Sequence, residues 1–314
     1  MRLNLFSAAL LGQCLVAAQD LANVTWPNSF PKQIAAVRRR EGLTTSEFQY
    51  HHIFVHGRKA WNAPDTVDQP LAYVQDHVFD SAYGINTTKN SINPSYFGHS
   101  DMTELYSRSQ DAFATPPPNN YTSTIIGPDG AAFSDFSASV NMYAHEVFYP
   151  VNSSCQHPIQ ASAPNAFYWI FANASNANTS SFENATFAGS IMDSLVSAFP
   201  PGAIYNASIH TSVAGMDSRG YYGGYNNPTL NAVLKFWLCD DHQAITAFRK
   251  AQSGLISQNE KLQINLDNSF VIFTRPILIY DRTTNTPFDT ARAQKALLTN
   301  GFSSNAIVAP LNLT

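Results

Sequence analysis

The sequence predicts an α+β protein in which one arrangement of elements, β-α-β-β-α-β, occurs twice along the chain. Segments that alternate between apolar and polar residues, as half-buried strands do, are separated by longer segments with helical periodicity. The order of these segments in the first half recurs in the second half. Two four-stranded sheets can then pack face to face, with their helices outside.

The first predicted unit, residues 19–151, has one long helix between its first two strands. That helix is expected over residues 43–61, where Thr44 and Glu47 have the T-x-x-E spacing of a capping box. A later helical region is interrupted at 116–118 by three prolines, each of which lacks a backbone donor. The strands of this unit are expected over residues 33–40, 71–79, 101–107 and 139–151.

The second predicted unit, residues 165–282, follows a linker over residues 152–164. Its strands are expected over residues 166–173, 203–213, 232–240 and 269–281, and its helices over 180–199 and 242–257. The tail, residues 283–314, contains one further helix over 289–298. Both units therefore have the element order of the ferredoxin-like fold.

The N-terminal 18 residues are typical of a secretory signal peptide. Arg2 precedes an apolar run over residues 3–16, and small residues follow at Ala17 and Ala18. No later segment reaches the roughly 20 apolar residues of a membrane span. We therefore expect a secreted protein without a membrane span.

Glycosylation sequons and cysteines agree with export. Once Cys14 is removed, Cys155 and Cys239 remain, and an oxidising compartment is expected to join them. If Asn206 carries a glycan it faces solvent, and His210 then shares its outward strand face. The sequons begin at Asn23, Asn86, Asn120, Asn152, Asn173, Asn178, Asn184, Asn206 and Asn312.

Charge and motifs exclude several classes of function. The formal net charge is −4 and the longest run of adjacent cations is the three arginines at 38–40, so nucleic acid is not an expected partner. The sequence has no G-x-S-x-G elbow, phosphate loop or dinucleotide fingerprint, which argues against such hydrolases and against NAD or ATP use.

The segment EFQYHHIFVHG places His51, His52 and His56 on the predicted long helix. At 100° per residue, Phe48 and Val55 face the sheet and His52 and His51 flank them, with His56 at the edge. We expect His51 to be exposed.

A metal site on this helix is not expected. His52 and His56 have the i, i+4 spacing of a helical zinc pair, but Ile53 stands where a zinc protease has glutamate.

Acid–base chemistry suits these histidines better than metal binding does. A histidine with a pKa near ~6.5 can accept a proton from an acidic carbon or phenol and return it to a leaving hydroxyl. His77, on the predicted strand face of Tyr73 and Phe79, is a candidate for a second proton-transfer group, with a structural role as the alternative. Asp101 and Glu104 are candidates for orienting a histidine.

An apolar cavity would hold a planar substrate beside these groups. Its expected lining is Phe48, Tyr73 and Phe79, with Tyr222 as part of an aromatic lid. The alternative for Tyr222 is a flexible glycine-rich loop.

The run VRRREGLTTSEFQYHHIFVHG resembles the start of the EthD domain, whose approximate pattern is R-K-x-G-L-T-x-E-E-F with a histidine eight residues after the phenylalanine. Phe48 and His56 keep that spacing. The segments HSDMTELYSRSQDAF, IIGPDGAAFSD and HEVFYP resemble later parts of the same domain. The resemblance covers residues 31–151, and residues 160–282 match by element order alone.

The resemblance implies a dimeric α+β barrel. Single-domain members usually form dimers, so a tandem chain implies an intrachain pseudo-dimer that is a monomer. Fungal relatives include dehydratases that act on aromatic polyketides without metal or organic cofactor, and other members are oxidoreductases. His56 matches the histidine of the family pattern.

We therefore expect a secreted enzyme without a cofactor that dehydrates or isomerises a small aromatic or polyketide-like molecule. A cofactor-free oxidase or oxygenase of the same family is the closest alternative. A non-catalytic extracellular binder of apolar small molecules is a third. The feature that separates an enzyme from a binder is whether His56 and His52 or His77 gather at one enclosed site.

Overall fold

The computed structural model describes most of the chain after residue 30, and the predicted signal peptide lies outside the described residues. The described residues are 31–64, 69–84, 95–109, 112, 120–151, 164–171, 181–213, 230–239, 241–258, 262 and 264–301.

Eight antiparallel strands close into a barrel in the order β1-β3-β2-β8-β5-β7-β6-β4. This confirms an α+β fold, and each half of the chain contributes a sheet of four strands to the single closed barrel. The order of the first four strands, β4-β1-β3-β2, recurs in the last four as β8-β5-β7-β6, and the two sheets join through β2–β8 and β4–β6. The strands are β1 (Pro31–Arg39), β2 (Ala72–Tyr83), β3 (His99–Tyr106), β4 (Ser134–Tyr149), β5 (Asn165–Phe171), β6 (Ile204–Ser212), β7 (Leu230–Leu238) and β8 (Phe270–Asp281).

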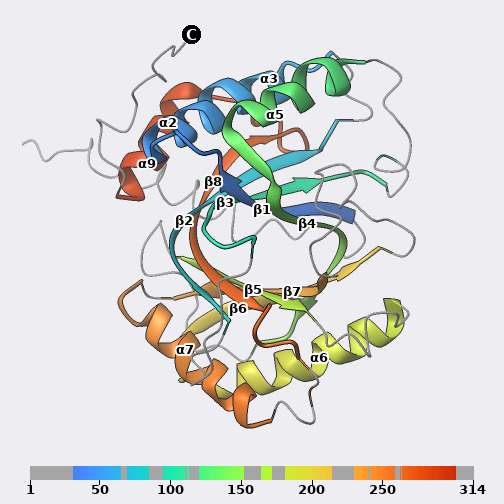
Figure 1. The fold of residues 1–314 in the computed structure, drawn as a ribbon, viewed down its shortest axis with the longest axis vertical. Coiled ribbons are helices and arrows are strands. Elements are labelled where there is room, and N and C mark those ends of the chain that lie inside the picture. Colours follow the sequence, from blue (N-terminus) through green and yellow to red (C-terminus); the bar gives the residue numbers. More distant parts are fainter. Residues whose placement is uncertain are drawn as a thin grey trace, which may run out of the picture.

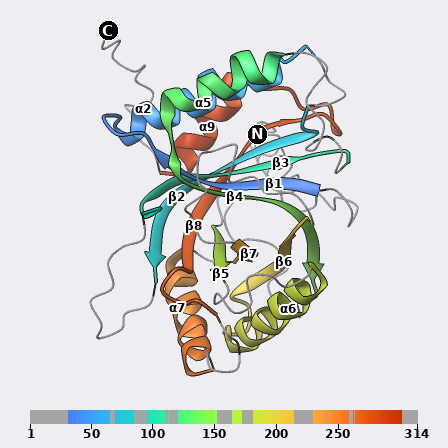
Figure 2. The same ribbon diagram turned by 45° about the vertical axis from the view of Figure 1, so that its right-hand side comes forward.

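Helices cover the barrel on two opposite sides (Figure 1). One layer contains α2, α3, α5 and α9, and the other contains α6 and α7. Figure 2 shows β4 and β8 curving from one layer toward the other. The helical segments are α2 (Thr45–Tyr50), η1 (His51–Gly57), α3 (Arg58–Trp61), η2 (Thr122–Ile126), α5 (Gly127–Phe133), α6 (Ser181–Ala198), α7 (Asp241–Ser257) and α9 (Thr290–Thr299).

Successive side chains of a strand point to opposite faces of the sheet. The barrel therefore has one core in its interior and further cores between the strands and the helices. Trp169 faces the interior with Met102 and Met142 of the first sheet, whereas its neighbour Tyr168 packs against α7 through Phe248. Both faces of the strands are therefore buried. One face packs against helices, and the opposite face packs against the strands across the barrel interior.

The predicted capping box is present. The Thr44 amide donates to Glu47 Oε2 at 2.7 Å, and the Glu47 amide donates to Thr44 Oγ1 at 3.2 Å. The helix that follows is not α-helical throughout, because η1 is a π-helix that contains all three histidines. Such turns are rare and are frequently found at functional sites.

The π-helix corrects the predicted helix faces. Val55 is half-buried and does not define the sheet-facing stripe, whereas Ile53 and Phe54 are buried beside β8 and α9. His51 is only 17 % exposed, so the expectation that it is solvent-exposed is also wrong.

The predicted position of His210 is wrong as well. It is fully buried in the barrel interior, with Nε2 3.1 Å from Glu146 Oε1. Strand β6 is covered by α6 on one face and by the interior on the other, so the face that holds His210 is not a solvent face. Asn206 is half-buried and Asn120 is exposed. The other sequons lie outside the described side chains.

The predicted disulfide and the predicted absence of a membrane span can be compared with the described residues only in part. Cys239 is buried after β7, whereas Cys155 lies outside the described residues, and their disulfide stays a prediction. Within the described part of the chain, no helix has both the length and the apolar character needed to cross a bilayer.

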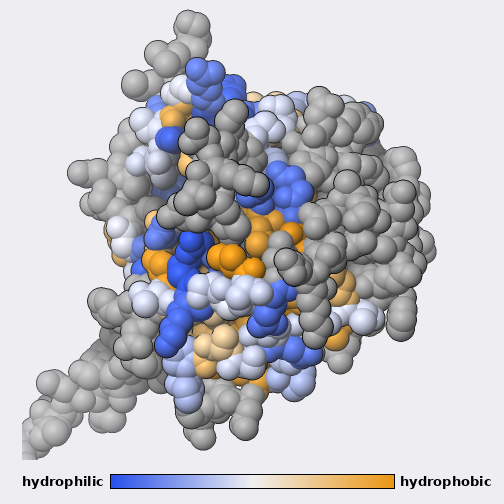
Figure 3. All heavy atoms as spheres, turned by 60° about the horizontal axis from the view of Figure 1, so that its bottom comes forward, coloured by the Kyte–Doolittle hydropathy of each residue, from blue (hydrophilic) through white to orange (hydrophobic). Residues whose placement is uncertain are grey.

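Large exposed apolar side chains are spread over separate elements, and the face in Figure 3 mixes hydrophobic and hydrophilic residues.

Candidate functional site

A buried histidine lies between η1 and the first sheet, held at both ring nitrogens. His52 Nδ1 is 2.7 Å from Asp101 Oδ2 on β3, and Nε2 is 2.8 Å from the hydroxyl oxygen of Tyr73 on β2. Gln75, two residues along β2, donates to the His52 carbonyl oxygen at 2.9 Å and contacts the Tyr73 hydroxyl at 2.8 Å. These four residues and His77 form what we call the His52 group.

The contacts of Gln75 determine where the protons of the group lie. A carbonyl oxygen only accepts, so the Gln75 atom beside the His52 carbonyl is the amide nitrogen. The same nitrogen donates to the Tyr73 oxygen, which leaves the tyrosine proton for His52 Nε2. His52 then carries its own proton on Nδ1 and donates it to the Asp101 carboxylate.

Burial sets the protonation of the group near neutral pH. It lowers the pKa of His52 well below 6.5, and the neighbouring His56 and His51 lower it further. Burial also raises the pKa of Tyr73 well above 10 and raises that of Asp101 to about 7. The resting group therefore holds a neutral imidazole and a protonated phenol beside a carboxyl that titrates near neutrality.

His77 lies on the strand face of Tyr73 and Gln75, as predicted. Its Nε2 is 3.8 Å from Asp101 Oδ2, the oxygen that also contacts His52. Burial lowers the pKa of His77. One carboxylate thus faces both imidazoles.

The third predicted histidine, His56, joins a neighbouring group centred on Asp129 of α5. His56 Nδ1 is 2.9 Å from Asp129 Oδ2, and His51 Nε2 is 3.0 Å from Oδ1, which also contacts Lys59 Nζ. The His56 side chain is 14 % exposed, and its ring centre lies 5.7 Å from that of His52. The structure therefore gathers the three predicted catalytic histidines on one side of the first sheet.

Asp129 was not predicted as a site residue, because the segment GPDGAAF is too short for its helical periodicity to be recognised in the sequence. The available signal was Pro128 followed by an acidic residue, which is typical of a helix start.

Among the predicted substrate-binding residues, Phe48 and Tyr73 lie beside His52. The Phe48 ring is 5.5 Å from that of His52 and 5.7 Å from Phe133. Phe79 lies elsewhere, since a register shift between Val78 and Asp80 leaves it 37 % exposed, with its ring 4.7 Å from Arg275. Tyr222 lies outside the described residues.

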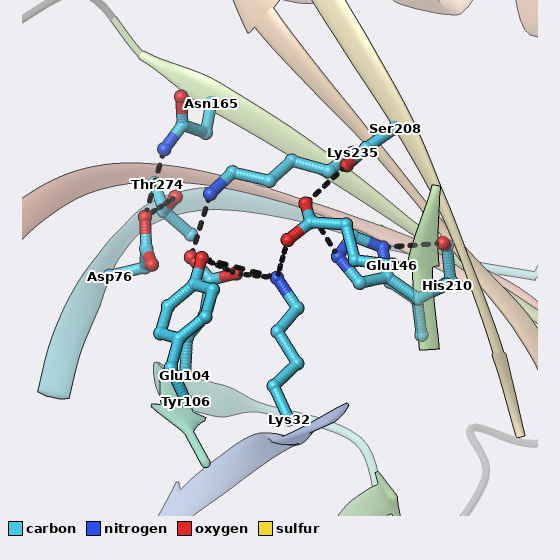
Figure 4. Close-up of polar contacts among 11 residues, drawn as sticks. Lys32, Asp76, Glu104, Tyr106, Glu146, Asn165, Ser208, His210, Lys235 and Thr274 are labelled. Atoms are coloured by element: carbon cyan, nitrogen blue, oxygen red, sulfur yellow. Dashed lines mark hydrogen bonds and ion pairs between the residues drawn. The ribbon is translucent and has the colours of Figure 1, made fainter. Parts of the chain in front are cut away.

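A second polar group, missed by the sequence analysis, occupies the barrel interior (Figure 4). Lys32 pairs with Glu104 and lies 3.0 Å from Glu146, and Lys235 Nζ lies 2.7 Å from Glu104 Oε1. His210 and Ser208 both contact Glu146 Oε1. We call this set the barrel network.

The barrel network explains why Glu104 does not orient a histidine. Asp101 and Glu104 are three residues apart on β3, so their side chains point to opposite faces. Burial would raise the pKa of Glu104, but Lys235 and Lys32 outweigh it and lower that pKa to about 2.

Asp76 extends the network along β2. Its Oδ1 accepts from Asn165 Nδ2 at 3.0 Å and from Thr274 Oγ1 at 3.1 Å. Burial, reinforced by the charge of Glu104, raises the pKa of Asp76 to about 7. At neutral pH this buried carboxyl group is partly protonated.

The described part of the chain contains no cluster of three or more histidine, cysteine, aspartate or glutamate side chains arranged to hold a metal ion.

Comparisons with known proteins do not identify a family. No family model matches the sequence, and no curated protein matches it. An anthrone oxidase-like protein of known structure aligns with a TM-score of 0.45 and 8% identity, over 82% of this chain and 96% of that chain. A mutant chlorite dismutase from Candidatus Nitrospira defluvii aligns with a TM-score of 0.43 and 8% identity, over 82% and 94% respectively. Similarities this weak carry no argument about activity.

Proposed function

We propose that the protein is a cofactor-independent enzyme that transfers protons on a small aromatic or polyketide-like molecule. One observation carries the proposal. His52 is buried with Asp101 on one ring nitrogen and the Tyr73 hydroxyl on the other. This is the arrangement of a general base that is oriented by a carboxylate.

Proton transfer would run through Tyr73, since its hydroxyl occupies His52 Nε2. A proton leaves the carbon next to a substrate carbonyl and passes to the Tyr73 oxygen, while the tyrosine proton moves to His52 Nε2. The imidazolium that forms faces the Asp101 carboxylate, which stabilises it.

Dehydration would follow by the reverse relay. The imidazolium returns its proton through Tyr73 to the β-hydroxyl group. The C–O bond then breaks and water leaves, so His52 ends in its starting state. Phe48 and Phe133 supply an apolar surround that excludes water.

The test is an assay of His52→Gln on aromatic β-hydroxy ketones, with no added metal or organic cofactor. We expect turnover by the wild type and a rate roughly 10²- to 10⁴-fold lower in the variant. His145→Gln is the matched control, because His145 lies on β4, outside the His52 group. An unchanged rate in His52→Gln would overturn the proposal.

Oxidation of a phenol is a second candidate function, since its first step is also removal of a proton by the same base. Oxygen uptake separates the two candidates, because dehydration consumes none. Tight binding of such compounds with neither water loss nor oxygen uptake would favour a non-catalytic binder.

We also propose that the chain is a fused pair of units, the first related to the EthD domain. The repeated strand order of the two halves supports this proposal. Secretion as a glycosylated monomer with a Cys155–Cys239 disulfide belongs to the same proposal, and mass spectrometry of the exported protein would test it.

A further inference from the structure

The helix that carries His52 is held from its outer side by a single carboxylate. Asp129 contacts His51 through Oδ1 at 3.0 Å and His56 through Oδ2 at 2.9 Å, and Lys59 also contacts Oδ1. Two imidazoles from η1 and an ammonium group from the following helix α3 therefore converge on one side chain of α5.

The spacing of the two imidazoles depends on the π-helix. On an α-helix, residues five apart are rotated by about 140°, so they cannot both face one carboxylate. A π-helix repeats at i→i+5, which brings such residues to one side. Asp129 can contact both His51 and His56 because η1 has this form. The same contacts stabilise η1 against relaxation to an α-helix.

His52 is part of the turn that Asp129 holds. Its backbone carbonyl accepts from Gln75 on the sheet side, and its ring reaches Asp101 and Tyr73. Rotation of η1 toward α-helical geometry would turn the ring away from these partners. Asp129 of α5 and Gln75 of β2 thus hold η1 from opposite sides.

Helix α5 adds an aromatic contact one turn after Asp129. The Phe133 ring stacks on that of His52 at 4.5 Å and lies 5.0 Å from that of His56 and 5.3 Å from that of His51. Burial would raise the pKa of Asp129, but hydrogen bonds from His51, His56 and Lys59 outweigh it and hold the pKa well below its usual range. The carboxylate is therefore ionised at neutral pH.

We infer that Asp129 is a positioning residue, which keeps η1 in its π-helical form and thereby aims His52 at Asp101 and Tyr73. Its role in catalysis rests on the proposed function, whereas its role in placing the His52 ring does not.

The test is ¹⁵N and ¹H NMR of the histidine side chains in Asp129→Ala, Asp129→Asn and the wild type. His52→Gln identifies the His52 signals. In the wild type we expect one fixed tautomer, with a slowly exchanging proton on Nδ1 shared with Asp101. In Asp129→Ala we expect loss of that proton signal and averaging of the two nitrogen shifts.

The matched control is Asp135→Asn, which removes a carboxylate that pairs with Arg38 near the chain position of Asp129. It should leave the His52 signals unchanged. If Asp129→Ala does not fold, Asp129→Asn decides by the same criterion, because it keeps the side-chain shape. A folded variant with wild-type His52 signals would overturn the inference.

Turnover provides a separate readout. If the wild type is active, the Asp129 variants should lose at least tenfold in kcat with little change in KM, because substrate contacts remain. If the wild type is inactive toward every compound tried, the proposed function fails while the NMR result still decides the role of Asp129.

Discussion

Lys235 and Glu104 belong to opposite halves of the barrel, and the lysine Nζ lies 2.7 Å from the glutamate Oε1. Both side chains are buried, and Glu104 also pairs with Lys32 of its own half. Glu104 therefore pairs with two buried ammonium groups, and Glu146 supplies Lys32 with a second carboxylate. The polar contacts in the interior join the halves in addition to the apolar core.

Glu104→Gln is expected to destabilise the protein by about 3–5 kcal/mol, since it leaves two buried ammonium groups without their shared carboxylate. Urea unfolding measures the loss. Asp135→Asn is the control, because its pair with Arg38 is partly exposed and should cost only about 0–1 kcal/mol. Equal losses in the two variants would contradict a structural role for the barrel network.

Asp76→Asn should change how stability depends on pH. The folded-state pKa of Asp76 is about 7, above its usual value of 3.8, so folding favours the protonated carboxyl group. That contribution is fully present below about pH 4 and is lost as the pH rises through 7. Between pH 4 and 8 the wild type should therefore lose more stability than the variant. Measuring the free energy of unfolding of both proteins across this pH range tests the prediction. If the free energies of the two proteins change in parallel with pH, the pKa of Asp76 is not raised.

Tyr73→Phe should abolish the relay while keeping the ring. We expect turnover to fall by roughly 10²- to 10⁴-fold. Stability should fall by about 1–3 kcal/mol, because Gln75 and His52 each lose a buried partner. Tyr280→Phe is the control, since Tyr280 is equally buried on the neighbouring strand β8 and its hydroxyl interacts with Arg282 rather than with His52. Similar effects of the two substitutions would argue against a relay through Tyr73.

Gly57→Ala should destabilise the junction of η1 and α3. An added Cβ would lie 2.9 Å from Ile279 Cγ2, and relieving such a contact typically costs about 1–3 kcal/mol. Gly189→Ala is the matched control in α6, where an added Cβ meets nothing within 4 Å and should stabilise by up to about 1 kcal/mol. Thermal unfolding of both variants distinguishes close packing from helix propensity.

Strand positions could be predicted from sequence because alternation and turn residues are local signals. The strand predicted over 203–213 is β6 (Ile204–Ser212), and the helix predicted over 289–298 is α9. The capping box of Thr44 and Glu47 is local too. Such signals require no knowledge of what packs against the element.

The parts that could not be predicted depend on distant contacts. The π-helix is stabilised by Asp129, more than 70 residues away, so helical periodicity alone favours an α-helix. Isolated charges such as Lys32 and Glu146 on strands are ordinarily solvated. They become interior only when the second sheet closes over the first. The sequence named Asp101 as a candidate for orienting a histidine but did not indicate that this histidine is His52.

Closure of the barrel limits how this protein can be divided. In each half, the two outermost strands hydrogen-bond to strands of the other half, through β2–β8 and β4–β6. A fragment ending at Val151 would present two unpaired edges and an apolar sheet face, both of which promote aggregation. The halves should therefore be recoverable as soluble protein only when produced together, which makes the joint between β4 and β5 a natural position for a split-reporter design.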